Sequence, residues 1–154
     1  MTIAERVHQD MIAAMKAREE LRLSTLRMVK SALKLKEIDK RGPLTDAESI
    51  QILTTLIKQR REAIEQFTKG NRMELAEKEA AEIPIIEHYL PKMADEAQIA
   101  SIVQTVIADL TAAGTQPTAK EMGSVMKAVQ AKLQAADLRA DGKLVSDRVR
   151  AALA

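Results

Sequence analysis

The sequence predicts an all-α protein, and three observations carry that prediction. Apolar residues recur at helical spacing in seven segments of the 154-residue chain. A capping side chain stands three residues before a glutamate at positions 45–48, 71–74 and 118–121, which is the spacing of a capping box. No segment of convincing length alternates apolar and polar residues, and the chain has no internal repeat. We therefore expect helices packed on helices.

Three helices are predicted first along the chain. Apolar residues at every fourth position predict a helix over 3–17. A second, over 19–39, has apolar residues around most of its circumference, which is typical of a helix packed on several sides. Thr45 begins a third helix that runs to 69, and Gly70 is its expected C-terminal cap.

A fourth helix is predicted to begin at Asn71 and to be strongly charged up to Glu82. Pro84 should kink or restart it, because proline lacks an N–H and clashes with the preceding turn. Its acidic run fits either paired carboxylates for acid–base chemistry or a solvated helix face braced by Lys78, and the second interpretation is favoured. The run consists of Glu74, Glu77, Glu79 and Glu82.

The composition shifts after Pro91, where three further helices are predicted. Asp95 caps the first, over 96–113, and Thr118 caps the second, which ends near 135. A short last helix follows 141–142. We therefore expect two helical domains, 1–93 and 94–154.

Composition limits the kinds of function. The only large rings are Phe67 and Tyr89, so the core must be aliphatic and no aromatic platform can stack bases. The net charge of +2 is small, and the excess of cations lies in residues 1–41. Cysteine is absent, and no segment resembles a signal peptide or a membrane span, so a cytoplasmic location is expected, without membrane association.

No catalytic or metal-binding motif stands out. His8 and His88 are the only histidines, and neither has a second ligand at metal spacing on one helix face. The serines have no nearby basic partner, and the five glycines stand singly rather than in a phosphate loop. We expect no cofactor, no metal and no catalytic residue in this chain.

Two features of the predicted helices invite other interpretations. A basic strip falls within about 60° of one helix face, and it either contacts phosphates or pairs with the acids of the fourth helix. The strip consists of Arg27, Lys30, Lys34 and Arg41. Arg60 lies on the apolar stripe of the third helix, so it extends over the core or pairs between helices, and a structural role is favoured.

Several segments in a fixed order together resemble one family. They are 26–34 (LRMVKSALK), 56–62 (LIKQRRE), 67–72 (FTKGNR), 82–91, 122–127 (MGSVMK) and 139–145 (RADGKLV). The set is similar to the YqeY-like proteins of the GatB/YqeY group, over nearly the whole chain. The resemblance implies a C-terminal domain like the tail of the B subunit of aspartyl/glutamyl-tRNA amidotransferase, a glutamine-dependent carbon–nitrogen ligase. In that enzyme the tail helps to hold the body of the tRNA, while other domains transamidate.

This resemblance implies that tRNA and a protein of the tRNA-charging machinery are partners, and no DNA is expected. Without stacking rings, RNA would be recognised by its shape and backbone. The cations around the last two helices are the candidate contacts: Lys120, Lys127, Arg139, Lys143, Arg148 and Arg150. The helix start at 141–143 also offers N–H groups to a phosphate, although Asp141 would compete as its cap.

Two departures from the family pattern affect these expectations. Leu138 stands where the family usually has glycine before Arg139, which alters the turn into the last helix, and Pro84 interrupts a usually continuous stretch. Two functions stay open: a tRNA-associated module that is not catalytic alone, and a helical protein–protein adaptor without RNA binding. The balanced charge of residues 94–154 favours the second, and the resemblance favours the first.

Overall fold

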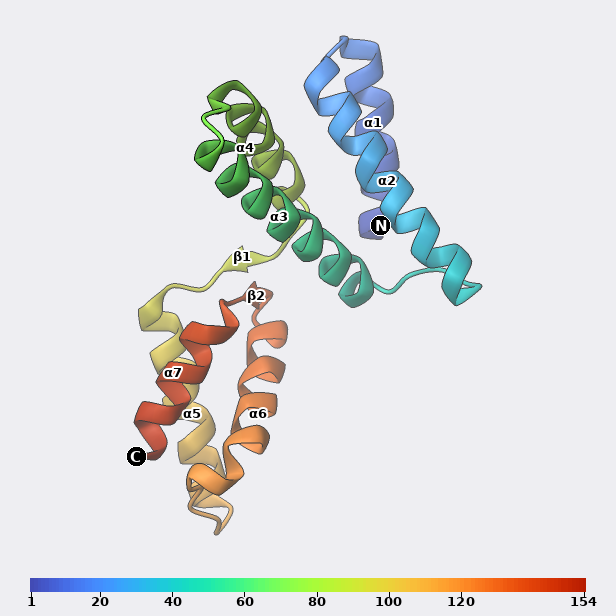
Figure 1. Ribbon diagram of the computed structural model, residues 1–154. Helices are drawn as coiled ribbons and strands as arrows, with labels where there is room; N and C mark the ends of the chain where they lie inside the picture. Colours follow the sequence, from blue (N-terminus) through green and yellow to red (C-terminus); the bar gives the residue numbers. More distant parts are fainter. The chain divides into compact units, whose positions relative to one another are not determined.

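The computed structural model describes residues 1–154 and confirms the all-α class (Figure 1). The chain divides into two compact units, one of residues 1–90 and one of residues 91–154. Each unit has its own apolar core. No helix combines the length and the apolar character that crossing a membrane requires. Whether the two units fold separately, with the predicted boundary between 93 and 94, stays a prediction.

Four helices form the N-terminal unit: α1 (Ile3–Ala17), α2 (Glu20–Lys40), α3 (Asp46–Lys69) and α4 (Met73–Glu87). α1 lies along α2, α3 and α4 form a hairpin, and α2 packs on α4. Leu26, Val29 and Leu53 are fully buried between these helices. Contacts with all three neighbours cover part of the wide apolar surface of α2, but Leu35 and Ile38 near its end stay exposed.

Capping explains most of the helix starts. Thr45 and Glu48 form the predicted capping box, and Thr2 with Glu5 forms another at the start of α1. The prediction at Asn71 is wrong. Asn71 adopts a left-handed backbone with φ of 56°, and the helix begins only after Arg72, which makes no side-chain cap. α4 is continuous through Pro84, so the predicted restart does not occur.

Three α-helices and one short 3₁₀-helix form the C-terminal unit, with two very short strands. In chain order they are β1 (Lys92–Met93), α5 (Glu96–Ala112), η1 (Ala119–Glu121), α6 (Met122–Ala135), β2 (Leu138–Arg139) and α7 (Gly142–Leu153). The three α-helices pack pairwise around buried valines such as Val103, Val129 and Val149. Asp95 caps α5, as predicted. Thr118 caps the 3₁₀ turn η1, whereas α6, which it was predicted to cap, begins only at Met122.

The strand pair was not predicted. β1 and β2 pair in parallel, with Lys92 opposite Leu138 and Met93 opposite Arg139. Leu138 is therefore extended rather than part of a tight turn, and it packs against the core of the unit. The left-handed backbone conformation lies one residue earlier, at Asp137, with φ of 53°. Leu138, expected from the resemblance to replace a glycine, thus lies in a strand.

Candidate nucleic-acid interface

The six predicted RNA contacts lie on η1, α6, β2 and α7 of the C-terminal unit. Lys127 and Lys143 are exposed and make no ion pair with any acidic side chain. Lys127 lies on the side of α6 opposite the buried Val125 and Val129, because two residues along a helix turn the side chain by about 200°. Both lysines can therefore reach a phosphate without losing an internal contact.

The remaining cations are spread around the unit. Lys120 precedes α6 and Lys143 follows it. The 14 residues of this helix put about 21 Å between its two ends. Arg150 pairs with Asp147 at 3.7 Å, and Arg148 lines a shallow cavity against α5. The six residues thus form a dispersed basic surface rather than one cluster. Such a surface suits an extended polyanion better than a small anionic ligand.

Arg139 differs from the others because its side chain bonds to a residue far away in the sequence. Its Nε donates a hydrogen bond to the carbonyl oxygen of Pro91 at 3.0 Å, which ties β2 to the residue before β1. The side chain is half-buried. Sequence reasoning did not reveal this contact, because the two residues are 48 positions apart. Arg139 therefore supports the strand pair as well as contributing charge.

The N-terminus of α7 is occupied by its own cap. Asp141 Oδ1 accepts a hydrogen bond from the backbone N–H of Lys143 at 2.8 Å. A phosphate at this helix end would have to displace that carboxylate. The structure therefore gives the lysine side chains, rather than the helix terminus, the better geometry for contact with a polyanion.

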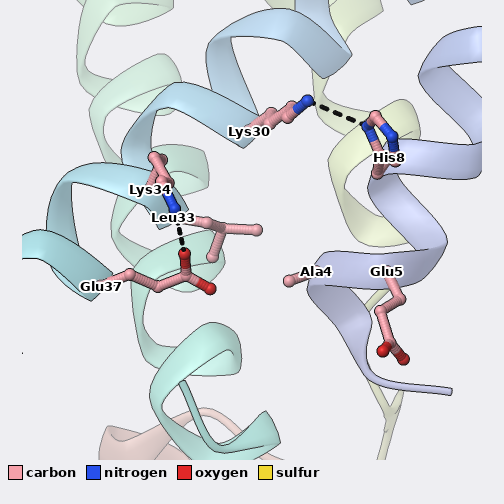
Figure 2. A pocket seen from close by; sticks show the side chains of 7 residues that line it. All are labelled: Ala4, Glu5, His8, Lys30, Leu33, Lys34 and Glu37. Atoms are coloured by element: carbon pink, nitrogen blue, oxygen red, sulfur yellow. Dashed lines mark hydrogen bonds and ion pairs between the residues drawn. The ribbon is translucent and has the colours of Figure 1, made fainter. Parts of the chain in front are cut away.

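The basic strip of α2 has a different arrangement. Lys30 Nζ lies 2.9 Å from His8 Nδ1, and Lys34 Nζ pairs with Glu37 at 3.2 Å, as Figure 2 shows. Arg27 and Arg41 are exposed, and neither forms an ion pair. The expectation that this strip pairs with the acids of α4 is therefore wrong.

A groove of about 390 Å³ lies between α1 and α2, beside the strip. Ala4 and Leu33 provide its apolar lining, and Glu5, His8 and Glu37 surround them with polar groups (Figure 2). The groove is open and has a mixed charge, with no convergent set of catalytic groups.

Arg60 has the predicted structural role. Its Nε pairs with Glu82 Oε2 at 2.8 Å, and its other nitrogens donate to the Leu56 carbonyl oxygen at 3.1 Å and to Met28 Sδ at 2.9 Å. Both charged side chains are nearly buried. The pair therefore connects α2, α3 and α4. Of the acidic run on α4, Glu82 is thus an internal partner rather than a solvated side chain.

A second polar cluster surrounds Tyr89 and was not anticipated. The buried Tyr89 hydroxyl donates to Asp10 Oδ2 at 2.6 Å, and Arg6 lies 5.4 Å from the centre of its ring. Burial, followed by the hydrogen bond to Asp10, raises the pKa of Tyr89 well above its usual range. The cluster ties the end of α4 to α1, and a contact over 79 positions leaves no local signal in the sequence.

No group of three or more His, Cys, Asp or Glu side chains is arranged to hold a metal ion. His88 contacts the ring of Tyr89 edge-on, with 5.2 Å between the ring centres. The exposed cations of the C-terminal unit and α2 are thus candidates for binding a charged partner rather than for catalysis.

Comparison with known proteins identifies the family. A family model described as Yqey-like protein matches residues 4–153. This chain belongs to the YqeY-like family. The match spans both compact units, so neither unit is an addition to the family pattern.

Relatives of this YqeY-like chain occur in fungi. A Lachancea thermotolerans protein named altered inheritance of mitochondria protein 41, mitochondrial, is 35% identical over 89% of this chain and 73% of its own length. A protein of the same name from Kluyveromyces lactis is 41% identical over 66% of this chain, which covers only 57% of that protein. An uncharacterized Schizosaccharomyces pombe protein is 33% identical over 57% of this chain and 72% of its own length.

The names of these relatives contradict the expected location. The Lachancea thermotolerans and Kluyveromyces lactis proteins are both named as mitochondrial, so the prediction of a cytoplasmic location is wrong. The prediction rested on the lack of cysteine, of a signal-peptide pattern and of membrane-spanning segments. None of these properties separates the two compartments, since a small helical chain without cysteines fits both.

Proposed function

We propose that this YqeY-like protein is a tRNA-associated helical module, related to glutamine-dependent amidotransferases and not catalytic by itself. It holds the body of a tRNA through its C-terminal unit, by shape and backbone. The observation that carries the proposal is a compact three-helix unit with exposed cations, in the part of the chain that resembles the amidotransferase tail. Related proteins of the tRNA-charging machinery are the protein partners that fit this role.

The electrostatics support a weak contact. Lys127 and Lys143 have no competing ion pair, and Lys120 and Arg148 add charge on neighbouring surfaces. A contact of this kind would neutralise roughly three to five phosphates, so the slope of log affinity against log salt would be about −3 to −4.5. Contacts to the backbone carry little sequence information, so different tRNA species would bind alike.

The test is tRNA binding by the full chain and by the double variant Lys127→Ala/Lys143→Ala. Arg139 is kept, because its bond to Pro91 supports the strand pair. We expect the double variant to bind every tRNA species more weakly and with a shallower salt dependence. The matched control is Lys58→Ala/Lys78→Ala, which removes the same charge from exposed positions of the N-terminal unit and should bind like the parent.

A full chain that binds no tRNA at low salt would leave the protein–protein adaptor as the function. Equal losses in the test and control variants would mean that only net charge matters, which would also contradict the proposed surface. Glutamine hydrolysis that is abolished by a point change in this chain would refute the non-catalytic role.

A further inference from the structure

We propose that the outward face of α2 binds an acidic, amphipathic helix of a protein partner. This docking face consists of Arg27, Lys34, Leu35, Ile38 and Arg41. It lies in the N-terminal unit and uses none of the cations assigned to tRNA. The inference therefore goes beyond the proposed function and stands or fails separately.

The apolar part of the docking face is unusually exposed. Leu35 is 63% exposed and Ile38 is 62% exposed, although most large aliphatic side chains of the unit are in its core. Residues three apart on a helix are neighbours on its surface. A single exposed apolar residue is ordinary, whereas an adjacent aliphatic pair with a polar border is the kind of surface that a partner covers.

The cations form a row beside this pair. Arg27 and Lys34 are seven residues apart, so they lie nearly in line along α2 and about 10 Å apart. Arg41 follows as the C-cap of the helix and adds a third cation at that end. Arg27 and Arg41 form no ion pair, and Lys34 pairs only with Glu37 on its own helix. Carboxylates at seven-residue spacing on a partner helix would meet this row, as charged residues do beside the apolar contact of a coiled coil.

A cavity at the end of α2 is large enough to bind an apolar side chain of the partner. It measures about 300 Å³ and is lined by Lys34, Glu37, Ile38, Gly42 and Pro43. Two of these, Lys34 and Glu37, also line the groove between α1 and α2, so the two hollows adjoin. A concave surface beside exposed aliphatic side chains fits the helix-in-groove mode of recognition.

A protein helix fits this face better than RNA does. Exposed aliphatic side chains gain nothing from a phosphate, and the face has no aromatic ring on which a base could stack. An acidic amphipathic helix instead satisfies both parts of the face, because its apolar side chains cover Leu35 and Ile38 while its carboxylates meet the cations.

The probe for the test is a 21-residue synthetic peptide, as long as α2, with leucine at heptad positions a and d and glutamate at e and g. Repulsion between the glutamates keeps the free peptide monomeric. We expect saturable binding to the full chain in fluorescence anisotropy. Arg27→Glu/Lys34→Glu should weaken binding by about tenfold or more, and a peptide with lysine at e and g should bind this variant better than the parent.

Two further variants separate the contributions. Leu35→Gln/Ile38→Gln should weaken binding even at high salt, because it removes apolar contact rather than charge. Lys58→Glu/Lys78→Glu makes the same charge change elsewhere in the unit and should bind like the parent. Arg41 stays unchanged, because its backbone has a left-handed φ of 60°.

Three outcomes would overturn the proposal. The first is that the acidic peptide does not bind even at millimolar concentration. The second is that the control variant weakens peptide binding as much as Arg27→Glu/Lys34→Glu does. The third is that the lysine peptide binds the Arg27→Glu/Lys34→Glu variant no better than it binds the parent. If the α2 variants instead lose tRNA binding, the face is an RNA surface. A failure here leaves the tRNA test of Lys127 and Lys143 unaffected.

Discussion

Arg60 shows how one side chain connects three helices of the N-terminal unit. Its guanidinium reaches Glu82 on α4, a carbonyl of α3 and the sulfur of Met28 on α2. The charge is nearly buried, so the desolvation penalty is offset only while all of these partners are in place. Its neighbour Arg61 makes a longer contact with Glu87 at 3.4 Å and is 65% exposed, which provides an internal comparison.

Replacement of Arg60 by methionine should lower the free energy of unfolding by about 3–5 kcal/mol, because Glu82 would be left charged and nearly buried. Arg61→Met should cost no more than about 1 kcal/mol, as exposed ion pairs contribute little. Urea unfolding measures both. The double variant Arg60→Met/Glu82→Met should recover most of the loss, and a double variant as unstable as the single one would contradict this account.

At the scale of elements, the sequence was enough to predict where the helices lie but not where every helix begins. The predicted range 3–17 agrees with α1, and Thr45 and Gly70 bound α3 as expected. These successes follow from periodicity and capping chemistry, which are local properties. The start at Asn71 failed because the chain turns there, and a left-handed residue cannot be the extended N-cap of a helix. Strands of two residues are too short to show an alternating pattern.

Glu48 connects the end of α2 with the start of α3. One carboxylate oxygen accepts from Lys40 Nζ at 2.7 Å and from the Thr45 N–H at 2.8 Å. The hydrogen bond from Lys40, followed by that from Thr45, lowers the pKa of Glu48 below its ordinary value of 4.5. Its contribution to stability is therefore present above that pH and is lost as the pH falls through the lower pKa of the folded state.

Glu48→Gln should accordingly lower the thermal midpoint at pH 7, because the amide keeps the cap but loses the ion pair with Lys40. The difference from the parent should shrink as the pH falls below 4.5, since protonation removes the same charge from the parent. Melting curves by circular dichroism from pH 7 to pH 3 measure this. Glu62→Gln, at an exposed position of α3, is the control. A gap that stays constant over this range would show that the charge of Glu48 is irrelevant.

For the whole molecule, the sequence predicts two groups of helices but not how their surface charges are distributed. The structure divides into its two compact units between residues 90 and 91. The grouping of cations depends on packing: Lys127 is on α6, Lys143 is in the first turn of α7, and Arg139 bonds to the Pro91 carbonyl oxygen. None of this follows from charge counts along the chain. The docking face of α2 was likewise visible only as a basic strip, because exposure of Leu35 and Ile38 is a tertiary property.

A fragment of residues 91–154 should fold alone as a helical unit, because it contains a complete core and both strands. A fragment of residues 94–154 lacks β1 and the Pro91 carbonyl that Arg139 contacts, so it should melt at a lower temperature. Circular dichroism of both fragments measures this. An unfolded 91–154 fragment, beside a full chain that melts as one cooperative transition, would mean that the units depend on each other.

The bond between Tyr89 and Asp10 also sets an order of events during synthesis on the ribosome. α1 and α2 leave the exit tunnel together early and can pair at once, since they are adjacent in the chain. Tyr89 follows Asp10 by 79 positions, which corresponds to a delay of roughly 4–16 s at translation rates of about 5–20 residues per second. During this interval the nascent helical hairpin lacks its aromatic contact and exposes the α1 surface that Tyr89 later covers. That surface of the nascent N-terminal unit therefore stays accessible to proteases and chaperones until Tyr89 has emerged.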